Sequence, residues 1–203
     1  MYKIIRRFFH KDKVIDKAQQ IAEARLSFEY SRIDRKLLSA YLQQSVDLPT
    51  DLKLFIQQGL SYVDRERIPL DEEYLLLKSY VGFFEGYLGS EILVSFDFPV
   101  KPNGLFIPAF LLFPMIQNAF HHGYHTSKKY PVRIKGKLIA DTLSLEVSNR
   151  VNHHIADQSQ TELIQFFRSR LDHEYKDQYD LILNSNSYTF KATLRLKLGG
   201  VNP

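Results

Sequence analysis

The side chains best placed to do chemistry lie at the C-terminal end of an apolar stretch. This stretch, Ile107–Gly123, reads IPAFLLFPMIQNAFHHG. Four polar residues there could act as ligands or hydrogen-bonding groups: Gln117, Asn118, His121 and His122. Histidines four residues apart on a helix can hold zinc, and His121 and His125 have that spacing. We expect Gly123 to end the helix between them, however, and neither a carboxylate nor a cysteine completes a ligand set. The pattern therefore does not predict a zinc site.

Composition excludes several other classes of protein. The 203 residues include no cysteine, which rules out disulfides and thiolate metal sites and fits a reducing, cytoplasmic compartment. The net charge of +4 is small and dispersed, so no nucleic-acid partner is expected. No nucleophile-elbow motif supports a Ser/His/Asp hydrolase, and His153-His154 is typical of a solvated loop.

The N-terminal residues predict neither a membrane span nor a leader peptide. No run in the chain approaches the roughly 18 apolar residues of a span. The start, MYKIIRRFFHKDK, is basic and lacks a long apolar region, so it makes a poor signal peptide. It is compatible with a juxtamembrane remnant of a larger receptor.

The elements that would position these side chains begin with helices. From Ile15 to Tyr41 apolar residues recur every three or four positions, which predicts one helix of about 30 residues, roughly 45 Å long. A helix of that length needs a partner helix to bury its stripe. Leu48-Pro49 should break it, with Thr50 capping a second helix whose face includes Leu60 and Val63.

A third helix is expected to follow Pro69, which should stop the second. Asp71, Glu72 and Glu73 would occupy its first turn, where carboxylates favour the positive end of the helix dipole, and Gly89 would end it.

Alternation with a period of two then predicts strands at Ile92–Phe98, Val132–Lys135 and Leu143–Val147, with a turn at Ala140-Asp141. A helix at Glu162–His173 and a closing hairpin turned by Asn184–Ser187 complete the chain. Helices beside an antiparallel sheet make the second half an α+β two-layer sandwich.

This order of elements resembles LytS-type sensor histidine kinases, which join a dimerising helical region to a Bergerat-type ATP-binding domain. The resemblance runs from about Ala22 to Leu198. It implies a basic segment at 1–12, a helical dimerisation and phosphotransfer-like domain at 13–90, and a histidine-kinase ATPase-like domain at 91–203.

The family's N box reads roughly P-x-x-L-x-P-L-V-E-N-A-x-x-H-G and is similar to Pro108–Gly123. By this resemblance Asn118 would ligate Mg²⁺, with His122 and Gly123 at the nucleotide site and Asn149 accepting from the adenine amino group. Gln117 stands where the family has its glutamate, and an amide cannot take a proton, so base catalysis is not expected.

The resemblance also shows where working residues of the family are replaced. In the phosphoacceptor register, Lys36 stands in place of the histidine, and a protonated amine is a poor nucleophile near neutral pH. Thr161 and Leu163 replace the glycines whose backbone amides would reach the phosphates, and Phe166 replaces an asparagine.

These replacements favour a pseudo-histidine kinase in two-component signal transduction. It would bind no cofactor, dimerise through Lys13–Leu88, and regulate a histidine kinase, a response regulator or another signalling partner. The exposed face of the first helix is the expected contact. The alternative is an active, divergent histidine kinase or ATPase that binds Mg-ATP through Asn118 and Asn149. A receptor fragment without its sensor region fits either reading.

Overall fold

The computed structural model describes residues 17–44, 47–88, 93–98, 104–123, 131–153 and 158–198. Within these ranges the chain forms, in order, α1 (Lys17–Arg32), α2 (Arg35–Gln44), α3 (Thr50–Ser61), β1 (Arg67–Pro69), α4 (Leu70–Leu88), β2 (Val94–Asp97), β3 (Phe106–Pro108), α5 (Phe113–His122), β4 (Val132–Ile139), β5 (Thr142–Arg150), a 3₁₀ turn η2 (Gln158–Gln160), α6 (Glu162–Tyr175), β6 (Tyr179–Ser185) and β7 (Thr189–Lys197). The predicted order of elements is confirmed from α3 onward except for the short strands β1 and β3, which were not predicted.

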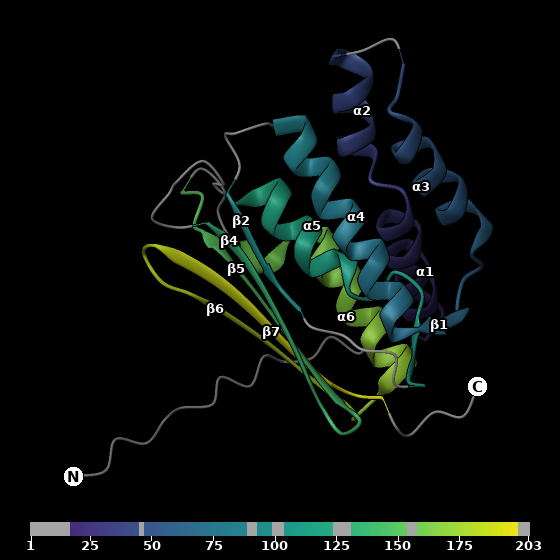
Figure 1. The fold of residues 1–203 in the computed structure, drawn as a ribbon. Coiled ribbons are helices and arrows are strands. Elements are labelled where there is room, and N and C mark those ends of the chain that lie inside the picture. Colours follow the sequence, from purple (N-terminus) through teal and green to yellow (C-terminus); the bar gives the residue numbers. More distant parts are fainter. Residues whose placement is uncertain are drawn as a thin grey trace.

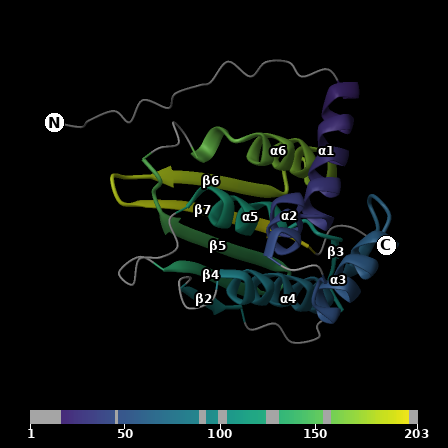
Figure 2. The same ribbon diagram turned by 90° about the horizontal axis from the view of Figure 1, so that it is seen from above.

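The main sheet has five strands in the order β2-β4-β5-β7-β6, and α4, α5 and α6 cover one of its faces (Figures 1 and 2). This layering is the predicted two-layer sandwich preceded by a helical segment. The expectation of an antiparallel sheet is wrong at one edge, because β2 pairs parallel with β4. The connection between them runs through α5, which crosses the sheet and returns the chain in the same direction.

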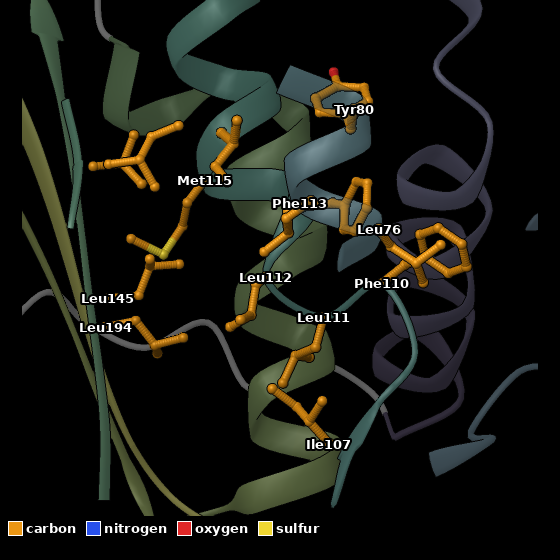
Figure 3. Close-up of a cluster of buried hydrophobic side chains, with 14 of the residues drawn as sticks. Leu76, Tyr80, Ile107, Phe110, Leu111, Leu112, Phe113, Met115, Leu145 and Leu194 are labelled. Carbon is orange, nitrogen blue, oxygen red and sulfur yellow. The ribbon is translucent and has the colours of Figure 1, made fainter. Parts of the chain in front are cut away.

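A contiguous apolar core lies between the sheet and the helices. Inward positions alternate along β5 and β7, so that Leu145 pairs with Leu194. Met115 of α5 packs over this pair, while Phe113 and Tyr80 lie on the opposite side of α5, toward α4 (Figure 3). The core thus fixes α5, the helix that carries the polar residues, between the sheet and the helical segment.

The prediction of one long first helix is wrong, because the chain breaks at Ile33-Asp34. Asp34 Oδ1 accepts hydrogen bonds from the backbone N–H groups of Lys36 and Leu37, at 2.9 and 3.0 Å, and so caps α2. A capping carboxylate satisfies the free N–H groups of a new helix start, which an uninterrupted helix would not need.

The buried face of α1 also differs from the predicted apolar stripe. Ala24, Ser27, Phe28 and Ser31 are buried, whereas Ala18, Ala22 and Leu26 are exposed. Small serines let α1 pack closely on α6, where Ser169 Oγ donates to Glu23 Oε2 at 2.5 Å. A search for apolar periodicity misses a face that uses serine for close packing.

Several helix and strand boundaries differ from the predicted ones. Helix α3 ends at Ser61, so Pro69 does not stop it. Instead Pro69 lies in β1, which pairs with β3, and Ile107-Pro108 is therefore strand rather than the start of the apolar helix. Thr50 makes no side-chain cap, and Leu60 and Val63 are exposed.

Three expected starts and turns are confirmed: α4 begins at Leu70, α6 at Glu162, and β4 turns into β5 at Ala140-Asp141. The closing hairpin turns later than predicted, because Asn184 and Ser185 belong to β6. The predicted domain boundary at Gly89–Glu91, like His125 and His154, lies outside the described residues. The boundary stays a prediction, and α4, which it assigns to the helical domain, packs on β2 through Tyr74 and Phe96.

Candidate functional site

A clamped turn, Ala109–Leu112, sets the start of α5. The Glu73 carboxylate accepts from the N–H groups of Phe110 and Leu112 at 2.8 and 2.9 Å, and Arg170 donates to the Ala109 carbonyl at 2.7 Å and the Phe110 carbonyl at 3.2 Å. Phe110 has φ 59°, a left-handed conformation that costs energy for a residue with a side chain. The surrounding hydrogen bonds hold it, so the clamp fixes where the polar end of α5 lies.

Both clamping side chains are fully buried. Burial raises the pKa of Glu73 to about 7, against the opposing effects of the two N–H donors and of the Arg170 charge. This pair comes from α4 and α6. The sequence predicted Glu73 only as a first-turn carboxylate of a helix and gave Arg170 no role.

Gln117 bonds the helical segment through its amide N–H group. It is buried, and its Nε2 donates to the backbone carbonyl of Tyr30 at 3.0 Å, near the end of α1. The amide therefore satisfies a carbonyl that the end of α1 leaves without a partner in its own helix. A glutamate would lack this N–H donor.

Asn118 and Asn149 meet in one buried network joined by Gln158. The Gln158 side chain donates to Asn149 Oδ1 at 3.3 Å and accepts from Asn149 Nδ2 at 3.2 Å, and it also donates to the Asn118 backbone carbonyl at 3.2 Å. Asn118 Nδ2 donates to the Gln158 carbonyl at 3.4 Å. Thr161 Oγ1 donates to Asn118 Oδ1 at 2.9 Å while capping α6. The side chains of Asn118 and Asn149 thus form their hydrogen bonds with other groups of the protein.

Gly123 closes this network from the other side. A Cβ built there would lie 2.3 Å from Asn149 Nδ2 and 2.5 Å from the Ala119 carbonyl oxygen. No real Cβ approaches so near, so glycine is needed here for close approach rather than for a special backbone angle.

Lys36 lines a separate cavity of about 440 Å³, which it shares with Gln117, His121 and His122. The cavity lies where the break between α1 and α2 faces the end of α5 and the start of α6. The structure therefore brings Lys36, Gln117 and His122 together, while Asn118, Gly123 and Asn149 belong to the neighbouring buried network.

The wall of this cavity contains a buried Asp34–His121–Tyr80 group. His121 Nε2 lies 2.7 Å from Asp34 Oδ2, which also accepts from the Tyr80 hydroxyl. Burial acts to raise the pKa of Asp34, but the hydrogen bond and charge of His121, with the bond from Tyr80, hold it below its usual value. The pKa of His122 falls to about 4 because it is half-buried and lies near the positive charges of Lys36 and His121.

Sequence reasoning missed Asp34, Tyr80 and Gln158. Asp34 could have been found, because an aspartate followed by a helical stretch is an N-cap signal. Gln158 lies in a polar loop and gives no such signal.

Two classes of feature are absent from the described ranges. No group of three or more His, Cys, Asp or Glu side chains there could hold a metal ion. No helix in these described ranges is long and apolar enough to cross a membrane.

Comparisons with known proteins support the fold. No family model matches the chain. A 107-residue stretch, 53% of the chain, is 25% identical to the sensor histidine kinase YpdA of Escherichia coli K12, but it spans only 18% of that protein.

Among solved structures, the histidine kinase domain of the blue-light activated kinase EL346 from Erythrobacter litoralis superimposes with a TM-score of 0.53 at 12% identity, covering 91% of this chain and 89% of that one. The Acinetobacter baumannii histidine kinase AdeS gives 0.51 at 9% identity, covering 90% and 97%. The fold is therefore that of histidine-kinase ATPase domains with a preceding helical segment.

Proposed function

We propose that the chain is a catalytically defective, histidine-kinase-like signalling protein of LytS type, which acts in the cytoplasm as a dimeric regulator or scaffold. Its partner would be a histidine kinase or a response regulator. The observation that carries the proposal is the closed network of Asn118, Asn149, Gln158 and Thr161.

Nucleotide binding needs the two asparagine side chains to face a ligand. Asn118 Oδ1, the atom that would ligate Mg²⁺, accepts from the Thr161 hydroxyl, and Asn149 exchanges hydrogen bonds with Gln158. Binding Mg-ATP would break these bonds without a glycine loop to supply replacement donors. As arranged, the residues do not fit Mg-ATP, and we derive no phosphoryl-transfer step.

Exposed apolar side chains support a dimer through the helical segment. Leu42, Leu54, Leu60 and Leu75 are each more than half exposed on α2, α3 and α4. Leu54 and Leu75 line the same groove between α3 and α4, where a second copy of the chain would bury them.

The nucleotide test is a thermal-unfolding titration of the whole chain with Mg-ATP, with a competent histidine kinase as positive control. We expect no shift in melting temperature up to millimolar nucleotide, because ligand binding to the folded state alone would raise it. A Mg²⁺-dependent shift together with transfer of radiolabelled phosphate to the protein would establish the active alternative instead.

The dimer test is light scattering over a range of concentrations. We expect a dimer that the double substitution Leu54→Gln and Leu75→Gln weakens. Ile139→Gln, a change at an equally exposed position on the sheet, should leave the dimer intact. A monomer at high concentration would refute the dimer.

A further inference from the structure

The 440 Å³ cavity beside α2 combines an apolar wall with a cationic mouth. Tyr30, Ile33 and Leu163 line it from α1, the α1–α2 break and α6, and Arg35 and Lys36 lie at the start of α2. Its volume is in the range that small organic ligands occupy.

The two cations are free to meet a ligand. Arg35 and Lys36 are exposed, and within the described residues neither side chain forms an ion pair. The Arg35 guanidinium lies over the Tyr30 ring, 5.9 Å from its centroid, so a flat group against Tyr30 would be close to this charge.

The carboxylates of the cavity do not cancel these charges. Asp34 points inward, where His121 and Tyr80 already bond it. Glu162, in the first turn of α6, is the remaining carboxylate of the lining. With Asp34 and His121 taken as a pair, the lining carries two cations and one anion.

His122 reports the resulting potential. Burial first, and then the positive charges of Lys36 and His121, lower the pKa of this imidazole to about 4. A bound anion would offset that charge and let His122 accept a proton.

We propose that this cavity binds a small organic anion, with a flat apolar body against Tyr30, Ile33 and Leu163 and its anionic group facing Arg35 and Lys36. This goes beyond the proposed function, which assigns the protein no ligand: Lys36, Gln117 and His122 line the cavity, whereas Asn118 and Asn149 do not. A ligand there contacts both the helical segment and the ATPase-like sandwich, so its binding would link the positions of these two parts.

The probe is naphthalene-1-sulfonate, which stays anionic at every working pH. It is titrated calorimetrically into the full chain, with sulfate alone and neutral 1-naphthol as separate arms. We expect saturable binding of the sulfonate at least 10-fold tighter than either arm, and at least 10-fold weaker binding after the double substitution Arg35→Gln and Lys36→Gln.

Two controls locate the binding. Lys137→Gln, at an exposed position of β4, removes a charge away from the cavity, and Ile139→Gln alters an exposed apolar position of the same strand. Neither should change the affinity. In a histidine-resolved NMR titration the pKa of His122 should rise on binding, with tighter sulfonate binding at pH 5 than at pH 8.

The proposal is overturned if the sulfonate does not saturate, if 1-naphthol or sulfate binds as well, or if the Arg35/Lys36 double variant binds unchanged. An unmoved His122 pKa in the presence of saturating sulfonate would overturn it too. A failed Mg-ATP titration affects none of these readouts, so the two proposals can fail separately.

Discussion

Replacing Gly123 by alanine tests the close contact that seals the carboxamide network. The added Cβ would meet the Ala119 carbonyl oxygen at 2.5 Å and two atoms of the Asn149 side chain at 2.3 and 2.7 Å. The carbonyl belongs to the last turn of α5 and cannot move without unwinding it, so Asn149 must swing away and lose its bonds to Gln158. Overpacking of this kind costs about 1–3 kcal/mol.

Gly82→Ala is the matched control. Gly82 lies in α4, and a Cβ there meets nothing within 4 Å. Replacing a helical glycine with alanine stabilises by about 0.5–1 kcal/mol. The two variants should therefore differ by about 1.5–4 kcal/mol in the free energy of unfolding.

Urea unfolding followed by circular dichroism measures this difference, and thermal midpoints give a second estimate at roughly 2–4 °C per kcal/mol for a chain of this size. If Gly123→Ala is as stable as the wild type while Gly82→Ala behaves as expected, the contact between Gly123 and Asn149 is not as tight as described. Gly123 would then not close the hydrogen-bond network of Asn118, Asn149 and Gln158.

Two further predictions concern buried carboxylates. Asp34→Ala removes the α2 cap and leaves the Tyr80 hydroxyl without its acceptor, which should destabilise the fold by about 2–4 kcal/mol at pH 7. Asp34→Asn keeps a capping oxygen and should lose less. If urea unfolding shows equal losses, the charge rather than the cap matters. Because the folded pKa of Asp34 is lowered, its stabilisation is present above about pH 4 and is lost as the pH falls further. Glu73 has the opposite sign: with a folded pKa of about 7 against 4.5 unfolded, the folded state binds more protons in that window, so stability falls as the pH rises from 4.5 to 7. Glu73→Gln should remove this slope from a series of urea curves, and an unchanged slope would contradict the assignment.

Much of the fold could be predicted from local patterns. The alternation in Leu143–Val147 and the acidic first turn of α4 correctly gave a strand and a helix start, since each signal depends on nearby residues alone. The parallel pairing of β2 with β4 could not be predicted this way, because strand direction depends on the path of the chain between them.

In the candidate site, too, some residues could be predicted from the sequence and others could not. The resemblance pointed to Asn118 in the N box and to Asn149 after the strand Leu143–Val147, and the structure joins them through Gln158. That Gln158 bonds both could not be predicted, because the contact spans 40 residues to Asn118 and comes from a polar loop without periodicity. The serine-lined face of α1 was missed because hydrophobic patterns do not register small polar residues that allow close helix packing.

The buried guanidinium of Arg170 has a consequence for synthesis of the protein. It donates across 60 residues to a backbone carbonyl at the start of α5, and α6 also packs against α1, near the beginning of the described chain. Before α6 has left the ribosome, the turn at Ala109–Leu112 has the Glu73 half of its clamp and lacks the Arg170 half. Contacts this distant in sequence slow folding, so the apolar face of α5 should stay available to chaperones until α6 has been synthesised.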